Sequence, residues 1–104
     1  MKEYVSVDVE TTGLAPKQDK IIEIGAVRVR DGQIVGSFTC FVNPGRILPA
    51  HITELTGILQ EQVDEAETME SVLPAFLEFA PYGTSDFVRL WIFEARGGEY
   101  AAGF

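Results

Sequence analysis

The sequence predicts an α/β domain in which a three-stranded antiparallel meander is followed by helices. Residues 4–10 alternate between apolar and polar side chains, which is typical of a strand with one buried face. Residues 69–80 instead repeat apolar side chains every three or four positions, which is typical of an amphipathic helix. At 104 residues the chain has the size of one small domain.

The first 43 residues account for the meander. On the strand 4–10, one face carries Val5, Val7 and Val9. Residues 20–30 are rich in Ile and Val and predict a second strand. Asp31-Gly32 is a two-residue hairpin signal, so residues 33–42 are expected to return antiparallel to the second strand.

Helices are expected next along the chain. Pro49 and Gly57 bracket a short helix over 49–56, because proline suits a first turn and glycine a C-terminal cap. Another turn or two is expected near 60–65, where Leu59 provides no N-cap side chain.

The remaining elements are less regular. Pro74 leaves the start of the helix 69–80 open, since proline fits only a first turn without loss of a hydrogen bond. The apolar run 87–93 has the length of a buried parallel strand and is a candidate fourth strand.

The charge composition argues against one class of function, the simple binding of nucleic-acid backbones. The net charge is −8, and residues 47–104 carry most of the acidic excess. No basic stripe is available to neutralise phosphates, which argues against simple binding of nucleic-acid backbones.

Cys40 is the only cysteine, so no disulfide forms within the chain, and we expect it to pack inside a strand. No segment reaches the length of a membrane span or has the pattern of a secretory signal, which predicts a soluble, cytoplasmic protein.

Asp8 and Glu10 are the main candidates for chemistry. Two positions apart on a strand, their side chains point to the same face, near the strand's C-terminal end. Two converging carboxylates suit Mg²⁺ or Mn²⁺, which prefer oxygen ligands and can activate water beside a phosphoryl group. The simpler alternative is an amphipathic strand whose outer face happens to be acidic.

Five short stretches carry a resemblance to a known family. They are Val-Asp-Val-Glu-Thr-Thr-Gly-Leu (7–14), Ile-Ile-Glu-Ile-Gly-Ala-Val (21–27), Phe-Val-Asn-Pro (41–44), Ile-Thr-Glu-Leu-Thr-Gly-Ile (52–58) and Val-Leu-Pro-Ala-Phe-Leu (72–77). In this order they resemble the DnaQ-like 3′–5′ exonucleases of the DEDD superfamily, which include the proofreading subunit or domain of bacterial DNA polymerase III. The resemblance covers residues 4–80 and implies a truncated ribonuclease H-like fold. It divides the chain into residues 1–82, the N-terminal part of such an exonuclease domain, and a divergent tail, residues 83–104, that lacks the family's second and third motifs.

The resemblance assigns roles to individual residues. Asp8 and Glu10 match the first two metal-binding carboxylates. Thr11, Thr12 and Gly13 match the turn whose backbone lies against the 3′-terminal nucleotide. Three apolar or hydroxyl side chains complete the nucleotide pocket: Leu14 matches a residue that packs on the base, and Leu55 and Thr56 fall in the opposite wall. Without the resemblance, Thr11-Thr12-Gly13 would be an ordinary turn at the end of a strand, and Leu55 and Thr56 the end of a helix that packs on the sheet.

The sequence also departs from the family. The Asn-x-x-Phe-Asp motif, a later aspartate and the general-base His or Tyr are missing. Glu99 is a weak candidate to replace the missing aspartate, because metal sites tolerate little displacement. His51, the only histidine, lies too early for the general-base role and is read as a solvated helix residue.

Three functions remain open from the sequence. The first is a metal-dependent 3′–5′ exonuclease, incomplete and weakly active or inactive in this chain. The second is a non-catalytic module that binds a nucleotide or a partner protein, and the third is an acidic fold without a ligand. The resemblance implies a nucleic-acid 3′ end as substrate, single-stranded DNA first, and a DNA polymerase subunit as partner. An open sheet edge predicts a homo-oligomer.

Overall fold

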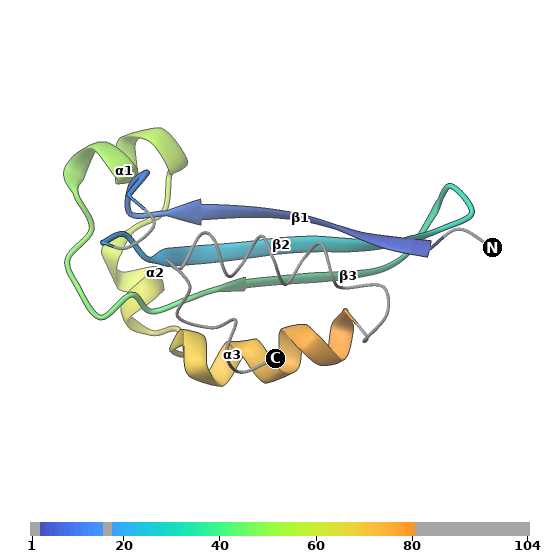
Figure 1. Cartoon of the computed structure of the whole chain (residues 1–104). Coiled ribbons are helices and arrows are strands. Elements are labelled where there is room, and N and C mark those ends of the chain that lie inside the picture. Colours follow the sequence, from blue (N-terminus) through green and yellow to red (C-terminus); the bar gives the residue numbers. More distant parts are fainter. Residues whose placement is uncertain (1–2, 16–17, 81–104) are drawn as a thin grey trace.

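A computed structural model describes residues 3–15 and 18–80, which form one antiparallel sheet with helices on one side and at one end (Figure 1). The elements are β1 (Glu3–Thr11), β2 (Ile21–Arg30), β3 (Gln33–Phe41), α1 (Ala50–Thr56), α2 (Gln60–Asp64) and α3 (Met69–Phe79). The strand order is β1-β2-β3, with both pairs antiparallel. The predicted meander is therefore confirmed.

The hairpin between β2 and β3 has the predicted turn. Asp31 and Gly32 both have positive φ angles, 48° and 81°, and they are flanked by the paired residues Arg30 and Gln33. Two consecutive positive φ values suit the right-handed twist of the flanking strands. The dipeptide signal thus predicted the return of the chain correctly, although the register shifts between Arg28 and Val29, two pairs beyond the turn.

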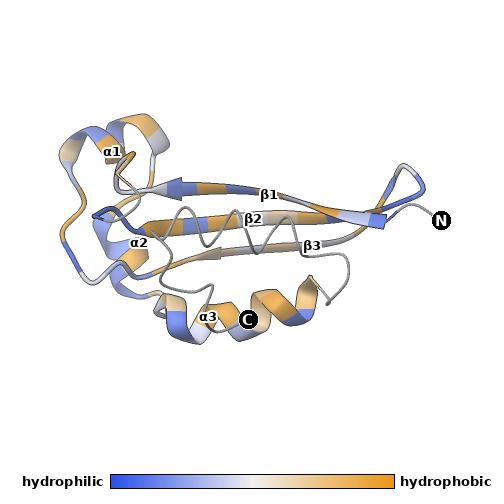
Figure 2. Ribbon diagram, viewed as in Figure 1, coloured by the Kyte–Doolittle hydropathy of each residue, from blue (hydrophilic) through white to orange (hydrophobic). Residues whose placement is uncertain are grey.

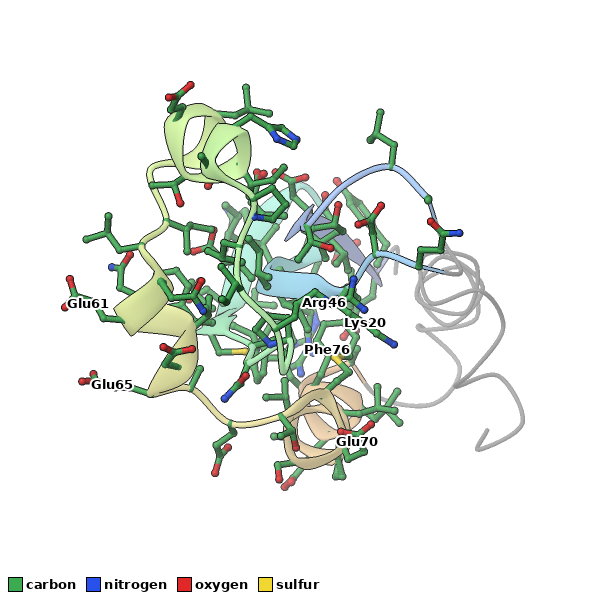
Figure 3. All side chains as sticks on the ribbon, turned by 90° about the vertical axis from the view of Figure 1, so that its left-hand side faces the viewer. Lys20, Arg46, Glu61, Glu65, Glu70 and Phe76 are labelled. Carbon is green, nitrogen blue, oxygen red and sulfur yellow. The ribbon has the colours of Figure 1, made fainter. Side chains whose placement is uncertain are left out.

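The main core lies between the sheet and α3. Its buried members include Val5 from β1, Ile24 and Ala26 from β2, and Val72 and Phe76 from α3. Figure 2 shows the long hydrophobic stretches of β2 and α3, and Figure 3 shows Phe76 between α3 and the sheet. The valine face of β1 is directed at this core, as its alternation predicted.

Helix α3 begins before Pro74 rather than at it. The helix runs from Met69 to Phe79 with Pro74 inside, so one backbone hydrogen bond to the preceding turn is missing. Packing compensates, because Phe76 is fully buried and its ring meets the Phe38 ring edge-on at 5.5 Å between centroids. At the other end the Arg28 guanidinium donates to the Phe79 carbonyl and lies over its ring.

A second, smaller core holds α1 and α2 at the end of the sheet. Its buried residues are Ile22, Leu48, Ile52, Ile58 and Val63. Helix α1 ends where predicted, at Gly57, which adopts the left-handed conformation with φ 78°. This cluster brings α1 beside the C-terminal end of β1 (Figure 1).

Some sequence expectations lie outside the described residues. The candidate fourth strand at 87–93, the divergent tail 83–104 and Glu99 belong to this group. Among the helices of the described part, none is long and apolar enough to cross a membrane.

Candidate active site

The two carboxylates of β1 lie on the sheet face opposite the main core. Val5 is buried and Val7 and Val9 pack against the core, so the alternating Asp8 and Glu10 project from the other face. The Asp8 side chain is exposed and that of Glu10 is half-buried. The structure thus places the pair on one face, as their spacing predicted.

A third carboxylate lies beside this pair, on β2. The sheet register sets Glu23 directly opposite Glu10, and directly opposed residues share a face. Burial raises the pKa of Glu23, and the negative charges of Glu10 and Asp8 raise it further. Within the described ranges, no group of three or more His, Cys, Asp or Glu side chains is placed to hold a metal ion. Asp8 and Glu10 therefore lie in a region of negative potential, with a third carboxylate on the neighbouring strand.

The chain turns sharply after Glu10. The pairing of β1 with β2 is irregular between Glu10 and Thr11, and the Thr11 hydroxyl donates to the Gly13 carbonyl. Thr12 points inward and is only 2% exposed. Leu14 is 98% exposed. The turn therefore buries its second threonine and presents a leucine to solvent.

A pocket of about 500 Å³ lies between this turn and α1. Its lining includes six of the residues singled out from the sequence: Glu10, Thr11, Gly13, Leu14, Leu55 and Thr56. Leu55 on α1 is 79% exposed, so the pocket has apolar side chains on both walls. Asp8 and Thr12 are not part of this lining. The structure thus brings most of the predicted residues together.

Three further lining residues were not expected at the site: Val9, His51 and Ile52. His51 is exposed, as predicted for a solvated helix residue, yet it also borders the pocket. Its spacing from Leu55 is four residues, which puts both on one face of α1. That spacing was the one signal in the sequence that linked His51 to the site.

The arrangement suits a small ligand with one charged and one apolar part. The volume is in the range of typical small-molecule pockets. At one wall, the Glu10 carboxylate provides a hard oxygen donor, and Asp8, which lies outside the lining, carries a second carboxylate on the same face of β1. At the mouth, Leu14 and Leu55 provide apolar surface that is free in this structure. A phosphorylated ligand would meet these carboxylates through a bridging cation.

Comparisons with known proteins show the family to which the chain belongs. A family model described as Exonuclease (RNase T) matches residues 5–86. The chain is 56% identical over 77 residues to a DNA polymerase III PolC-type of Clostridium perfringens, covering 74% of this chain and 5% of that protein. It is 43% identical to the PolC-type polymerase of Thermotoga petrophila, covering 93% of this chain and 8% of that protein. The chain therefore spans a small part of these relatives.

Solved structures give the fold. The nuclease domain of 3′hExo, a DEDDh family member bound to rAMP, has a TM-score of 0.69 at 22% identity, covering 94% of this chain and 61% of that one. Exonuclease X in complex with 5′ overhanging duplex DNA has a TM-score of 0.62 at 30% identity, covering 70% and 42%. The described residues thus have the ribonuclease H-like exonuclease fold, represented by its three-stranded sheet and following helices. With the family model matching most of its length, the chain belongs to the exonuclease family.

Proposed function

We propose that this chain carries part of the active site of a metal-dependent 3′–5′ exonuclease, and that its pocket takes the terminal nucleotide of a nucleic-acid 3′ end. The observation that supports this most is the pocket between the turn after β1 and α1, with the Glu10 carboxylate in its wall. Family membership supports the reaction class, phosphodiester hydrolysis that releases nucleoside monophosphates.

Asp8 and Glu10 fit a divalent cation as a partial ligand set. Both offer hard carboxylate oxygens, and Mg²⁺ sites commonly use one or two carboxylates, with waters and phosphate oxygens completing the shell. When bound, Mg²⁺ or Mn²⁺ supplies charge neutralisation at the phosphoryl group and a more acidic water. Two carboxylates alone make a weak site, so we expect weak metal binding in the absence of a nucleotide.

The protein's own residues would hold and orient the nucleotide. Leu14 and Leu55 offer apolar surface to a base, and such packing depends little on base identity. Gly13 also lines the pocket, so the backbone of the turn is available to contact the sugar. The site therefore reads a terminal nucleotide by shape and charge and is tolerant of sequence.

The substrate we propose is DNA, single-stranded at its 3′ end. The relatives above are DNA polymerases, which favours a proofreading role beside a polymerase subunit in the cytoplasm. Among solved structures of similar fold, Exonuclease X is bound to duplex DNA, whereas another 3′-exonuclease recognises a histone mRNA stem-loop. A test must therefore compare DNA with RNA.

The second candidate is a nucleotide-binding module without hydrolysis. The observation in its favour is the sequence itself, which lacks the family's Asn-x-x-Phe-Asp motif and a general base after α3. Loss of a general base typically costs about 10²–10⁴-fold in rate. Both candidates predict nucleotide binding, and only the first predicts cleavage.

The experiment combines binding and cleavage on the full chain. Titration calorimetry with thymidine monophosphate and Mn²⁺ should show binding that is lost in Asp8→Ala and kept in Glu61→Gln. Glu61 is a suitable control because its exposed carboxylate points into solvent from α2 (Figure 3).

A 3′-labelled DNA strand and its RNA counterpart, incubated with Mn²⁺, should release mononucleotides slowly, from DNA first and only with Asp8 present. Binding without release would favour the non-catalytic module. Absence of nucleotide binding by the wild-type chain would contradict both candidates.

A further inference from the structure

The turn that forms one wall of the pocket is closed by a single carboxylate, Asp19. Its Oδ1 accepts a hydrogen bond from the Thr12 hydroxyl at 2.8 Å, and its Oδ2 accepts one from the Ala15 N–H at 2.9 Å. Its own backbone N–H donates to the Ala15 carbonyl at 2.7 Å. Asp19 therefore contacts the turn before and after Leu14.

Thr12 links this carboxylate to the start of β2. The Thr12 N–H donates to the Lys20 carbonyl at 2.8 Å, and the Lys20 N–H donates to Thr12 Oγ1 at 2.9 Å. The Thr12 hydroxyl thus accepts one hydrogen bond and donates another, to Asp19. Thr12 can be buried inside the turn because its backbone N–H and its hydroxyl both have hydrogen-bond partners there.

Gly13 and Asp19 are complementary in shape. A Cβ placed on Gly13 would lie 2.5 Å from Asp19 Oδ2 and 2.8 Å from Asp19 Cγ, well inside van der Waals contact. Gly13 is not among the glycines with positive φ, so a side chain at this position is opposed by the Asp19 carboxylate and not by the backbone angle. The carboxylate therefore fills the volume that a side chain at position 13 would need.

The surroundings favour the charged form of Asp19. The hydrogen bonds from Ala15 and Thr12 lower the pKa of its carboxyl, and the nearby positive side chain of Arg46 lowers it further. Arg46 also donates to the Gln18 carbonyl at 2.6 Å, which ties the segment before Asp19 to the chain before α1. The acceptor that closes the turn is thus ionised at neutral pH.

We propose that Asp19 is a positioning residue for the nucleotide pocket: it fixes the turn 11–15 so that Gly13 and Leu14 line the wall opposite Leu55. The inference rests on the proposed function above. Asp19 itself is not in the pocket lining, so it acts through the turn and not by contact with the nucleotide.

Three variants test the proposal. Asp19→Ala removes both acceptors. Asp19→Asn keeps the shape and one acceptor oxygen, which can face the Ala15 N–H while the amide group faces Thr12 Oγ1. Gly13→Ala puts a Cβ 2.5 Å from Asp19 Oδ2, so the carboxylate must shift and strain its hydrogen bonds to Thr12 and Ala15. The effect of Gly13→Ala should therefore shrink in the double variant Gly13→Ala/Asp19→Ala.

The measurement is the dissociation constant of thymidine monophosphate with Mg²⁺, followed by NMR through the amide signals of the turn, together with the thermal midpoint. Loss of supporting contacts around a site typically costs tenfold to a hundredfold, so Asp19→Ala should weaken binding by at least about tenfold. Asp19→Asn should restore most of the affinity, and Glu61→Gln should match the wild type.

The outcomes separate this inference from the proposed function. Wild-type binding with equal affinity in Asp19→Ala would overturn the role of Asp19 and leave the proposed function standing. Equal loss in Asp19→Ala and Asp19→Asn, or strictly additive effects of the Gly13 and Asp19 substitutions, would also overturn it. A wild-type chain that binds no nucleotide would overturn both.

Discussion

Leu14 and Leu55 provide the most direct test of the pocket, because both are exposed in the free protein. Their exposed fractions are 98% and 79%, so neither side chain contributes much burial to folding. Surface substitutions of this kind usually change the free energy of unfolding by less than about 0.5 kcal/mol. Leu14→Ala and Leu55→Ala should therefore leave stability unchanged and affect only ligand binding.

The expected loss of affinity follows from the area that a base would cover. Full burial of a leucine side chain is worth about 1.5–3 kcal/mol. We expect a base to cover one side of each leucine, which is half of the burial behind that range. Each leucine should therefore contribute about 1 kcal/mol to the free energy of binding. This corresponds to about fivefold in the dissociation constant per substitution, and about 30-fold for the double variant if the two effects add.

Ile47→Ala is the matched control for these variants. Ile47 is 83% exposed, is as large as leucine and does not line the pocket. Titration calorimetry with thymidine monophosphate and Mn²⁺ measures the affinities, and urea unfolding measures stability. If the double variant binds as tightly as Ile47→Ala, the base does not pack on these leucines and the reasoning is wrong.

Three other predictions concern the fold. Phe76→Ala should lower the free energy of unfolding in urea by about 3–5 kcal/mol, because the ring is fully buried; a loss below 1 kcal/mol would contradict the core described above. Burial raises the pKa of the Cys40 thiol above its ordinary value of 9.0, so at pH 8–9 the folded protein contains less thiolate than the unfolded chain. Alkylation of Cys40 should therefore be much slower in the folded protein than in urea. In the sheet of the described residues β1 is an edge strand, from which we predict a homodimer; light scattering that gives a stable monomer of 11.5 kDa would refute it.

The local features of this fold were predictable from the sequence. The alternation along β1, the Asp31-Gly32 turn and the Gly57 cap each act over a few residues, and each appears in the structure as expected. The placement of Asp8 and Glu10 on one face follows from the same short-range rule. The start of the helix 69–80 stayed open in the sequence, because burial of Phe76 outweighs the hydrogen bond missing at Pro74 only once the sheet is in place.

The missed parts of the site depend on contacts between distant residues. Glu23 joins Asp8 and Glu10 only through the register of β2, which sets it opposite Glu10. His51 reaches the pocket because a separate cluster anchors α1 beside β1. Asp19 contacts Thr12 and Ala15 through hydrogen bonds that form only in the folded turn, and no periodic pattern in the sequence predicts them.

The pocket exists because β2 takes part in both hydrophobic clusters. Ile21 and Ile24 belong to the main core that fixes the sheet and β1, whereas Ile22 belongs to the small core that fixes α1. In a regular strand Ile22 and Ile24 would share a face and Ile21 would point the other way. The irregular pairing near Thr11, opposite Ile21, breaks this alternation, so that Ile21 joins Ile24 in the main core and Ile22 joins the small one. One wall of the pocket is thus anchored to the first cluster and the other wall to the second. The same irregular pairing between Glu10 and Thr11 lies at the start of the turn that Asp19 closes. One feature of the sheet therefore contributes both to the packing of the two cores and to the shape of the pocket.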